Sequence, residues 1–103
     1  MIDECLDYVL LDVSNRSGLH LSNNVNVELL PTSLHFKLRR ACQLLKALNS
    51  LKNMINITSK KRALFNKSSK IKELEEYKFE YEKIEKEYLS LLDEIASEVK
   101  KYL

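Results

Sequence analysis

The chain has almost no residues that break regular backbone structure. Gly18 and Pro31 are the only glycine and the only proline in 103 residues. An all-β fold needs a turn about every ten residues, and its turns rely on glycine and proline. The composition therefore disfavours a sandwich or barrel and favours helix. One glycine also leaves no glycine-rich loop that could cradle a nucleotide phosphate.

Long apolar runs and a cysteine framework are also missing. No apolar run approaches the roughly 18 residues that span a bilayer, and residues 1–4 lack the basic start of a signal peptide. We therefore expect an intracellular, cytoplasmic protein, with the nucleus as an alternative. Cys5 and Cys42 form no paired set, so we expect two buried thiols that behave as small apolar groups.

Acidic residues are absent from the middle of the chain. Between Leu29 and Lys72 there are eleven Lys or Arg residues and no Asp or Glu, while both flanking segments are acidic. The net charge of +2 conceals this segregation. Like charges grouped on one element favour contact with the opposite sign, either within the molecule or on a partner.

Residues 1–30 are expected to form a short N-terminal amphipathic helix followed by an irregular loop. From Ile2 to Val13 the apolar residues recur at helical spacing, and a helix of this length needs a surface to dock on. The Ser- and Asn-rich segment 14–24, which contains Gly18, predicts a loop. Alternating apolar residues in 19–29 would also allow a short strand pair, although an isolated pair is unstable.

Residues 31–103 predict a long helical hairpin. Pro31 and Thr32 are typical of a helix start. A first helix over 32–65 has apolar residues at steps of seven, and Thr58 leaves a break near residue 58 as an alternative. A second helix over 69–102 has the same spacing. The apolar residues at steps of seven are Leu34, Ala41, Leu48 and Ile55 in the first helix, and Leu74, Tyr81, Tyr88, Ile95 and Tyr102 in the second.

Equal helix lengths of about 51 Å and a short turn favour an antiparallel, coiled-coil-like pair. The fold class is therefore predicted to be all-α. The apolar stripe of the first helix is broader than a two-helix hairpin can cover. We expect it to be completed by the N-terminal helix, by a second copy or by other subunits, with Leu34, Leu38 and Ala41 as partner-packing residues.

The basic residues of the first hairpin helix are predicted to lie away from its apolar stripe. Arg39, Lys46, Lys60 and Lys67 all fall at one position of the seven-residue repeat. Two interpretations stay open. Flanking basic side chains reach sideways to the glutamates of the second hairpin helix, or the outer row faces solvent or an acidic partner.

The sequence contains no set of residues that predicts catalysis, a cofactor or a metal site. His35 and Cys42 share a helix face, but about 10 Å of axial rise separates them, which exceeds hydrogen-bond reach. Cysteine and histidine also lack the close ligand pairs of zinc sites. We therefore expect a non-enzymatic protein without cofactors.

The expected function is that of a structural or adaptor subunit in an oligomeric assembly of helical proteins, with a hetero-oligomer favoured over a homodimer. In architecture the predicted hairpin is similar to the small coiled-coil subunits of eukaryotic trafficking, tethering and kinetochore complexes, although no motif supports the likeness. Three alternatives remain: nucleic-acid binding through the basic middle helix, contact with an anionic membrane surface, and a chaperone or inhibitor of one partner protein.

Overall fold

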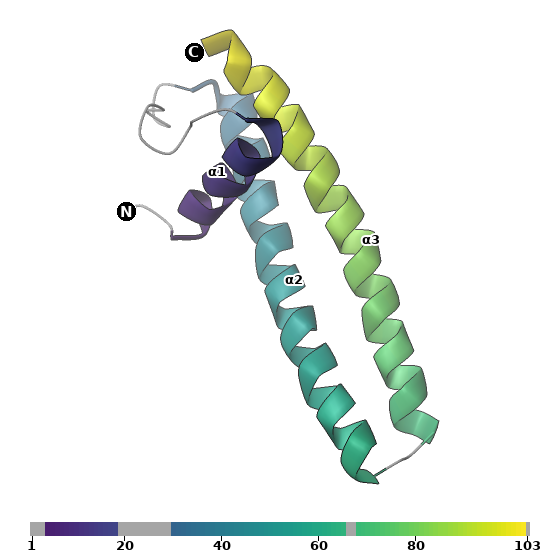
Figure 1. Cartoon of the computed structure of the whole chain (residues 1–103). Coiled ribbons are helices and arrows are strands. Elements are labelled where there is room, and N and C mark those ends of the chain that lie inside the picture. Colours follow the sequence, from purple (N-terminus) through teal and green to yellow (C-terminus); the bar gives the residue numbers. More distant parts are fainter. Residues whose placement is uncertain (1–3, 19–29, 66–67, 103) are drawn as a thin grey trace.

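The fold is a helical hairpin with a third helix docked across one end (Figure 1). The structure, a computed structural model, describes residues 4–18, 30–65 and 68–102. Its elements are α1 (Glu4–Ser17), α2 (Thr32–Phe65), α3 (Ser68–Val99) and a final 3₁₀ turn, η2 (Lys100–Tyr102). No strand occurs in these ranges. The predicted all-α class and the hairpin are confirmed.

Helix α1 continues past the point where the sequence predicted a loop. The prediction was wrong for residues 14–17, because both serines bond back to the preceding helical turn. The Ser14 hydroxyl donates to the Leu10 carbonyl at 2.9 Å and the Ser17 hydroxyl to the Val13 carbonyl at 2.5 Å. Gly18, with a φ of 78°, then ends the helix and donates its amide to the Ser14 carbonyl. The alternating segment 19–29 lies outside the described residues.

Helix α2 runs without interruption over the 34 residues from Thr32 to Phe65. The amides of Leu34 and His35 donate to the Pro31 carbonyl, which starts the first turn. The alternative of a break near residue 58 is wrong, because Thr58 is a buried residue inside the helix. None of the described helices has the length and apolar content needed to cross a membrane.

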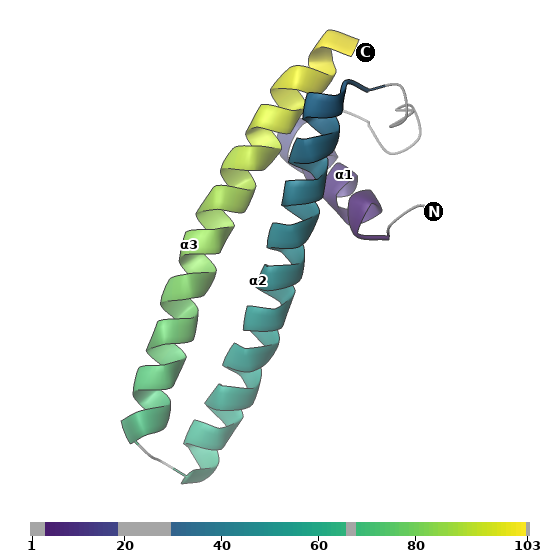
Figure 2. The same cartoon turned by 180° about the vertical axis from the view of Figure 1, so that it is seen from behind.

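Helices α2 and α3 are antiparallel and give the molecule its length of 53 Å, against 24 and 23 Å across. Helix α1 contacts both of them near the end where α2 begins and α3 ends. It lies on one broad face of the hairpin near that end, and Figure 2 looks onto the other face, which α1 leaves open.

The core is concentrated at the end where α1 docks. Val9 and Val13 of α1 are fully buried, and so are Leu34 of α2 and Ile95 of α3. Burial of such side chains contributes about 1.5–3 kcal/mol each before entropy is subtracted. The three helices therefore share one core at this end.

The sequence of α2 explains why α1 covers only part of the hairpin. Two rows of α2 residues at steps of seven begin as apolar and become polar further along the helix. The first row is Leu38, Leu45 and Lys52, and the second is Cys42, Asn49 and Asn56. The first two members of the first row and Cys42 belong to the core or pack against it, whereas Lys52, Asn49 and Asn56 are exposed. An apolar helix face gains nothing by extending over lysine and asparagine.

We expect Ile95→Ala to lower the free energy of unfolding by about 2–5 kcal/mol, because the side chain is fully buried and its loss leaves a cavity. Urea denaturation followed by circular dichroism measures the change. Ser97→Ala, an exposed position on the same helix, is the matched control and should change stability by less than about 0.5 kcal/mol. Similar changes in the free energy of unfolding for both variants would contradict the assignment of Ile95 to the core.

Candidate functional site

The residues predicted to pack against a partner lie in the chain's own core. Leu34 and Ala41 are fully buried and Leu38 is 2% exposed. They belong to the cluster to which α1, α2 and α3 all contribute. In this structure α1 is the element that covers the surplus apolar arc of α2, so these three residues present no surface to a separate chain.

The junction of the three helices brings together the chain's two thiols and a buried phenol. The Cys5 thiol of α1 donates to the Cys42 carbonyl of α2 at 3.4 Å. Both cysteines are buried thiols and neither forms a disulfide, as predicted. The Tyr88 hydroxyl of α3 donates to Asp12 Oδ2 of α1 at 2.6 Å. The sequence did not predict that the thiols lie at one junction, because 37 residues separate them and no local pattern relates them.

The Tyr88 hydroxyl is held in its protonated form. Only 4% of the residue is exposed, and burial in the core followed by the hydrogen bond to Asp12 raises the pKa of Tyr88 well above its ordinary range. An ionised phenolate there would lie beside the Asp12 carboxylate in a poorly hydrated site. The contact therefore acts as a structural tie between α1 and α3.

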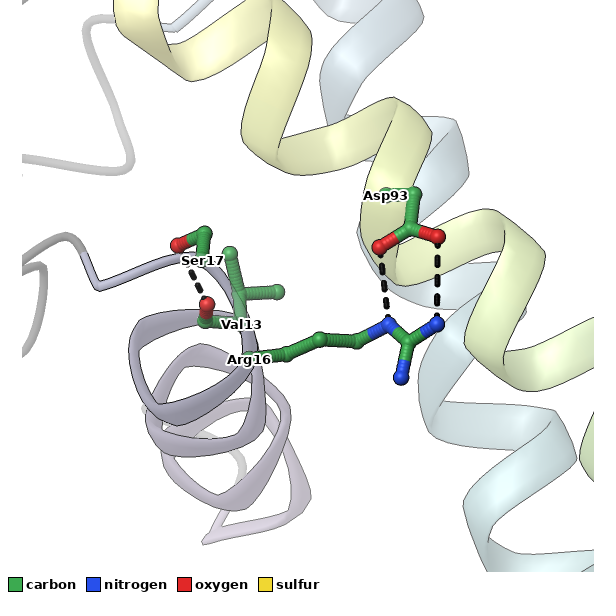
Figure 3. Close-up of polar contacts among 4 residues, drawn as sticks. All are labelled: Val13, Arg16, Ser17 and Asp93. Atoms are coloured by element: carbon green, nitrogen blue, oxygen red, sulfur yellow. Dashed lines mark hydrogen bonds and ion pairs between the residues drawn. The ribbon is translucent and has the colours of Figure 1, made fainter.

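An ion pair joins the C-terminal end of α1 to α3. Arg16 donates from Nε to Asp93 Oδ1 at 2.8 Å and from Nη2 to Asp93 Oδ2 at 3.3 Å (Figure 3). This two-bond contact lowers the pKa of Asp93 and raises that of Arg16. Both side chains are about half exposed, so the pair orients α1 more than it stabilises the fold.

Two further ion pairs join α2 to α3. Lys37 donates to Glu98, and Arg40 donates to Glu87 at 2.9 Å. The hydrogen bond from Lys37 to Glu98 raises the pKa of Lys37. These contacts match one of the two open interpretations of the basic residues, in which cations flanking the apolar stripe reach the glutamates of the neighbouring helix.

Four further cations of α2 are exposed. Arg39, Lys46 and Lys60, which the repeat placed away from the apolar stripe, all have exposed side chains, and so does Lys52. Lys67 lies outside the described residues. No acidic residue occurs anywhere in α2, so its exposed surface is positive along its whole length.

The half of the hairpin far from α1 has a thin core. We define the distal arm as residues 49–60 of α2 and 71–87 of α3. Within it, Thr58 and Leu74 are the only buried residues. Its other seam residues are partly exposed, and they are Leu51, Ile55, Ile71, Tyr77, Tyr81 and Ile84. The pKa of Tyr81 is raised by partial burial and by the neighbouring Glu85.

Several large apolar side chains also lie at the surface. Tyr8 and Leu11 are 61% and 48% exposed on α1, Met54 and Ile57 are 40% and 48% exposed on α2, and Phe79 of α3 is 69% exposed. The sequence did not single them out, because none belongs to the apolar rows at steps of seven that predicted the contact line of the hairpin. Exposed single apolar residues are common, but clusters of them are typical of interaction surfaces.

No group of three or more His, Cys, Asp or Glu side chains that could bind a metal occurs within residues 4–18, 30–65 and 68–102. His35 lies in α2, one helical turn before Arg39, and His20 lies outside the described residues. No protein-family model matches the sequence, and no curated protein or solved structure matches it either. Function is therefore inferred from the chain's own geometry.

Tyr88→Phe should lower the free energy of unfolding by about 1–2 kcal/mol below pH 9, because the charged acceptor Asp12 loses its donor. Tyr8→Phe on the exposed face of α1 is the control and should be nearly neutral. Since the pKa of Tyr88 is raised on folding, the contribution of this residue is full below about pH 10 and falls as pH rises. The difference between the wild type and Tyr88→Phe should therefore narrow between pH 9.5 and 11, a range set by the ordinary tyrosine pKa of about 10. A constant difference would contradict the assignment.

Asp93→Asn should loosen α1 without unfolding the hairpin, because it removes the carboxylate that Arg16 contacts. Since folding lowers the pKa of Asp93, its contribution is present above about pH 4 and is lost as pH falls further. Hydrogen exchange measures the effect, with α3 amides as the internal reference. Wild-type α1 should lose protection between about pH 4 and pH 3 relative to α3, while the variant should already be less protected at pH 7. Equal protection of α1 in both proteins at pH 7 would refute the role of the pair.

Proposed function

We propose that this protein is a non-enzymatic structural or adaptor subunit that holds other helical proteins along the distal arm of its hairpin. The single observation that carries the proposal is the incomplete core of that arm. Two helices share one contact line, and here that line leaves six large apolar side chains partly exposed. At the other end of the hairpin α1 is the third helix that completes the core. A helix from another protein could complete the core of the distal arm in the same way.

The shape of the molecule supports the same function. An arm that extends beyond the docked α1 in a molecule 53 Å long offers a long, narrow contact surface. Surfaces of this form suit helices that lie alongside and bury a continuous stripe. The blockwise charges of α2 and α3 would then select the partner and its orientation, because charge patterns contribute more to specificity than to affinity.

Isolation of a tagged copy from its native cells tests the proposal. We expect one or more helical proteins to be retained in stoichiometric amount through a wash at about 0.5 M salt, at which exposed charges are screened beyond roughly 4–5 Å. Apolar helix packing should survive such a wash. Recovery of nucleic acid or lipid that the salt removes, or of no stoichiometric protein at all, would overturn the proposal.

A pair of variants locates the contact. Leu51→Gln with Ile84→Gln should remove the retained proteins, because both residues lie in the partly exposed seam of the distal arm. Asn53→Gln with Ser90→Gln changes exposed positions on the same two helices and should retain them. Circular dichroism of both purified variants verifies that the hairpin is helical. Equal retention by the two variants would place the partner elsewhere.

A further inference from the structure

Two ion pairs between α2 and α3 identify the face of the hairpin opposite α1. Helix α1 occupies one side of the contact line between α2 and α3, where Arg16 reaches Asp93. The ion pairs from Lys37 to Glu98 and from Arg40 to Glu87 join the same two helices. A helix turns by 100° per residue, so Glu87 lies about 120° around α3 from Asp93, which faces α1. The pair from Arg40 to Glu87 therefore lies on the side of the hairpin away from α1. We call this side of α2 and α3 the open face (Figure 2).

Helix α3 contributes a line of glutamates to the open face. Residues seven apart lie close to the same face of a helix, so residues at steps of seven from Glu87 share its side. These residues are Glu73, Glu80, Glu87 and Glu94. Glu80 and Glu94 are exposed, while Glu87 pairs with Arg40 and Glu73 accepts a hydrogen bond from Tyr77. We call the four residues the glutamate ridge.

Helix α2 contributes an apolar strip beside this ridge. Ala47 and Met54 follow Arg40 at steps of seven, and Leu51 follows it by three full turns, so all three share the side of Arg40. Ala47 and Leu51 are partly exposed and Met54 is 40% exposed. The partly buried Ile84 of α3, one turn before Glu87, borders the same strip. An apolar strip therefore runs along a row of negative charge.

We propose that the open face binds a basic amphipathic helix of a partner protein. Its apolar side packs on the strip of Ala47, Leu51 and Met54, and its lysines or arginines pair with the glutamate ridge. The proposal rests on the proposed function and names the kind of partner. The chain already shows this chemistry on its other face, where α1 combines buried valines with the pair from Arg16 to Asp93.

A second copy of the chain does not fit this surface. Of the three described helices only α2 is net basic, and the apolar residues that it leaves accessible on this side, Ala47, Leu51 and Met54, are those of the strip itself. A second copy would therefore have to stack its own open face on this one. The two glutamate ridges would then lie either against each other, which like-charge repulsion opposes, or against the apolar strip of the other copy, where the carboxylates lose water without pairing. The occupant is consequently a different protein.

A pair of synthetic helical peptides tests the proposal on the full-length chain. Each peptide has about 18 residues, or roughly 27 Å of helix, with leucines along one side. One carries lysines on the remaining positions and the other carries glutamates. Fluorescence anisotropy at low salt should show the lysine peptide binding at least about tenfold more tightly than the glutamate peptide. Equal affinities would overturn the proposal.

Charge-reversal variants locate the binding to the ridge. Glu80→Lys with Glu94→Lys should weaken binding of the lysine peptide by about tenfold. Glu75→Lys with Glu82→Lys changes the net charge equally at exposed positions on the other side of α3. This variant should weaken binding of the lysine peptide by less than about threefold. Equal weakening by both variants would show attraction by net charge alone and overturn the site. Circular dichroism verifies that both variants fold.

The same variants separate this proposal from the proposed function. At low salt, where exposed charges are not screened, a tagged Glu80→Lys, Glu94→Lys chain should retain less of the helical proteins than the unmodified chain does, while the Glu75→Lys, Glu82→Lys chain should keep them. Equal retention by both would overturn the open-face site and leave the adaptor function standing. Absence of any retained protein from the unmodified chain would remove the adaptor function itself, whatever the peptides show. Self-association that Glu80→Lys with Glu94→Lys abolishes would identify a second copy as the occupant and refute the proposal.

Discussion

The docking of α1 across both hairpin helices is the contact on which the rest of the structure depends. Two antiparallel helices bury one line of side chains, which is too little apolar area for a stable core in a chain of 103 residues. Helix α1 adds fully buried Val9 and Val13 and covers the broad apolar arc of α2. A helix of 14 residues is marginal alone, so α1 and the hairpin stabilise each other.

This arrangement divides the hairpin into two halves with different physical properties. At the α1 end three helices share a continuous core, and Tyr88 and Arg16 tie α1 in place. In the distal arm only Thr58 and Leu74 are buried. Low local burial is associated with easy local opening, which suits a surface that adapts to a partner. The shared core and the proposed contact of the distal arm thus lie at different ends of the two helices, while the open face runs along both halves.

Charge segregation has two separable roles in this chain. Lys37 and Arg40 show that cations beside the seam neutralise glutamates of α3 within the molecule. Arg39 and Lys60 lie on exposed positions of α2, while Glu80 and Glu94 lie on exposed positions of α3. The repeat of seven places these outer charges in rows of opposite sign on the two helices. Such rows contribute little to stability when they are solvated, but they provide orientation and specificity for a charged partner.

The sequence by itself determined the elements of the fold, because helical periodicity, the scarcity of glycine and proline, and the helix start at Pro31 and Thr32 are local signals. The bounds of α2 coincide with those read from the repeat. The end of α1 does not coincide with the predicted end, because Ser14 and Ser17 bond back within the helix and Arg16 in its last turn contacts Asp93 of α3, a contact that exists only when α1 is docked.

Only the tertiary structure decided which apolar residues are buried in the core and which stay accessible. Leu34, Leu38 and Ala41 carry the strongest apolar pattern, yet they are buried in the core that α1, α2 and α3 share, while the weaker row of Ala47, Leu51 and Met54 stays accessible. Periodicity shows that a face is apolar but does not show what covers it. The covering element is selected by contacts between residues far apart in the sequence, such as Cys5 with Cys42 and Asp12 with Tyr88, and those contacts have no local signature.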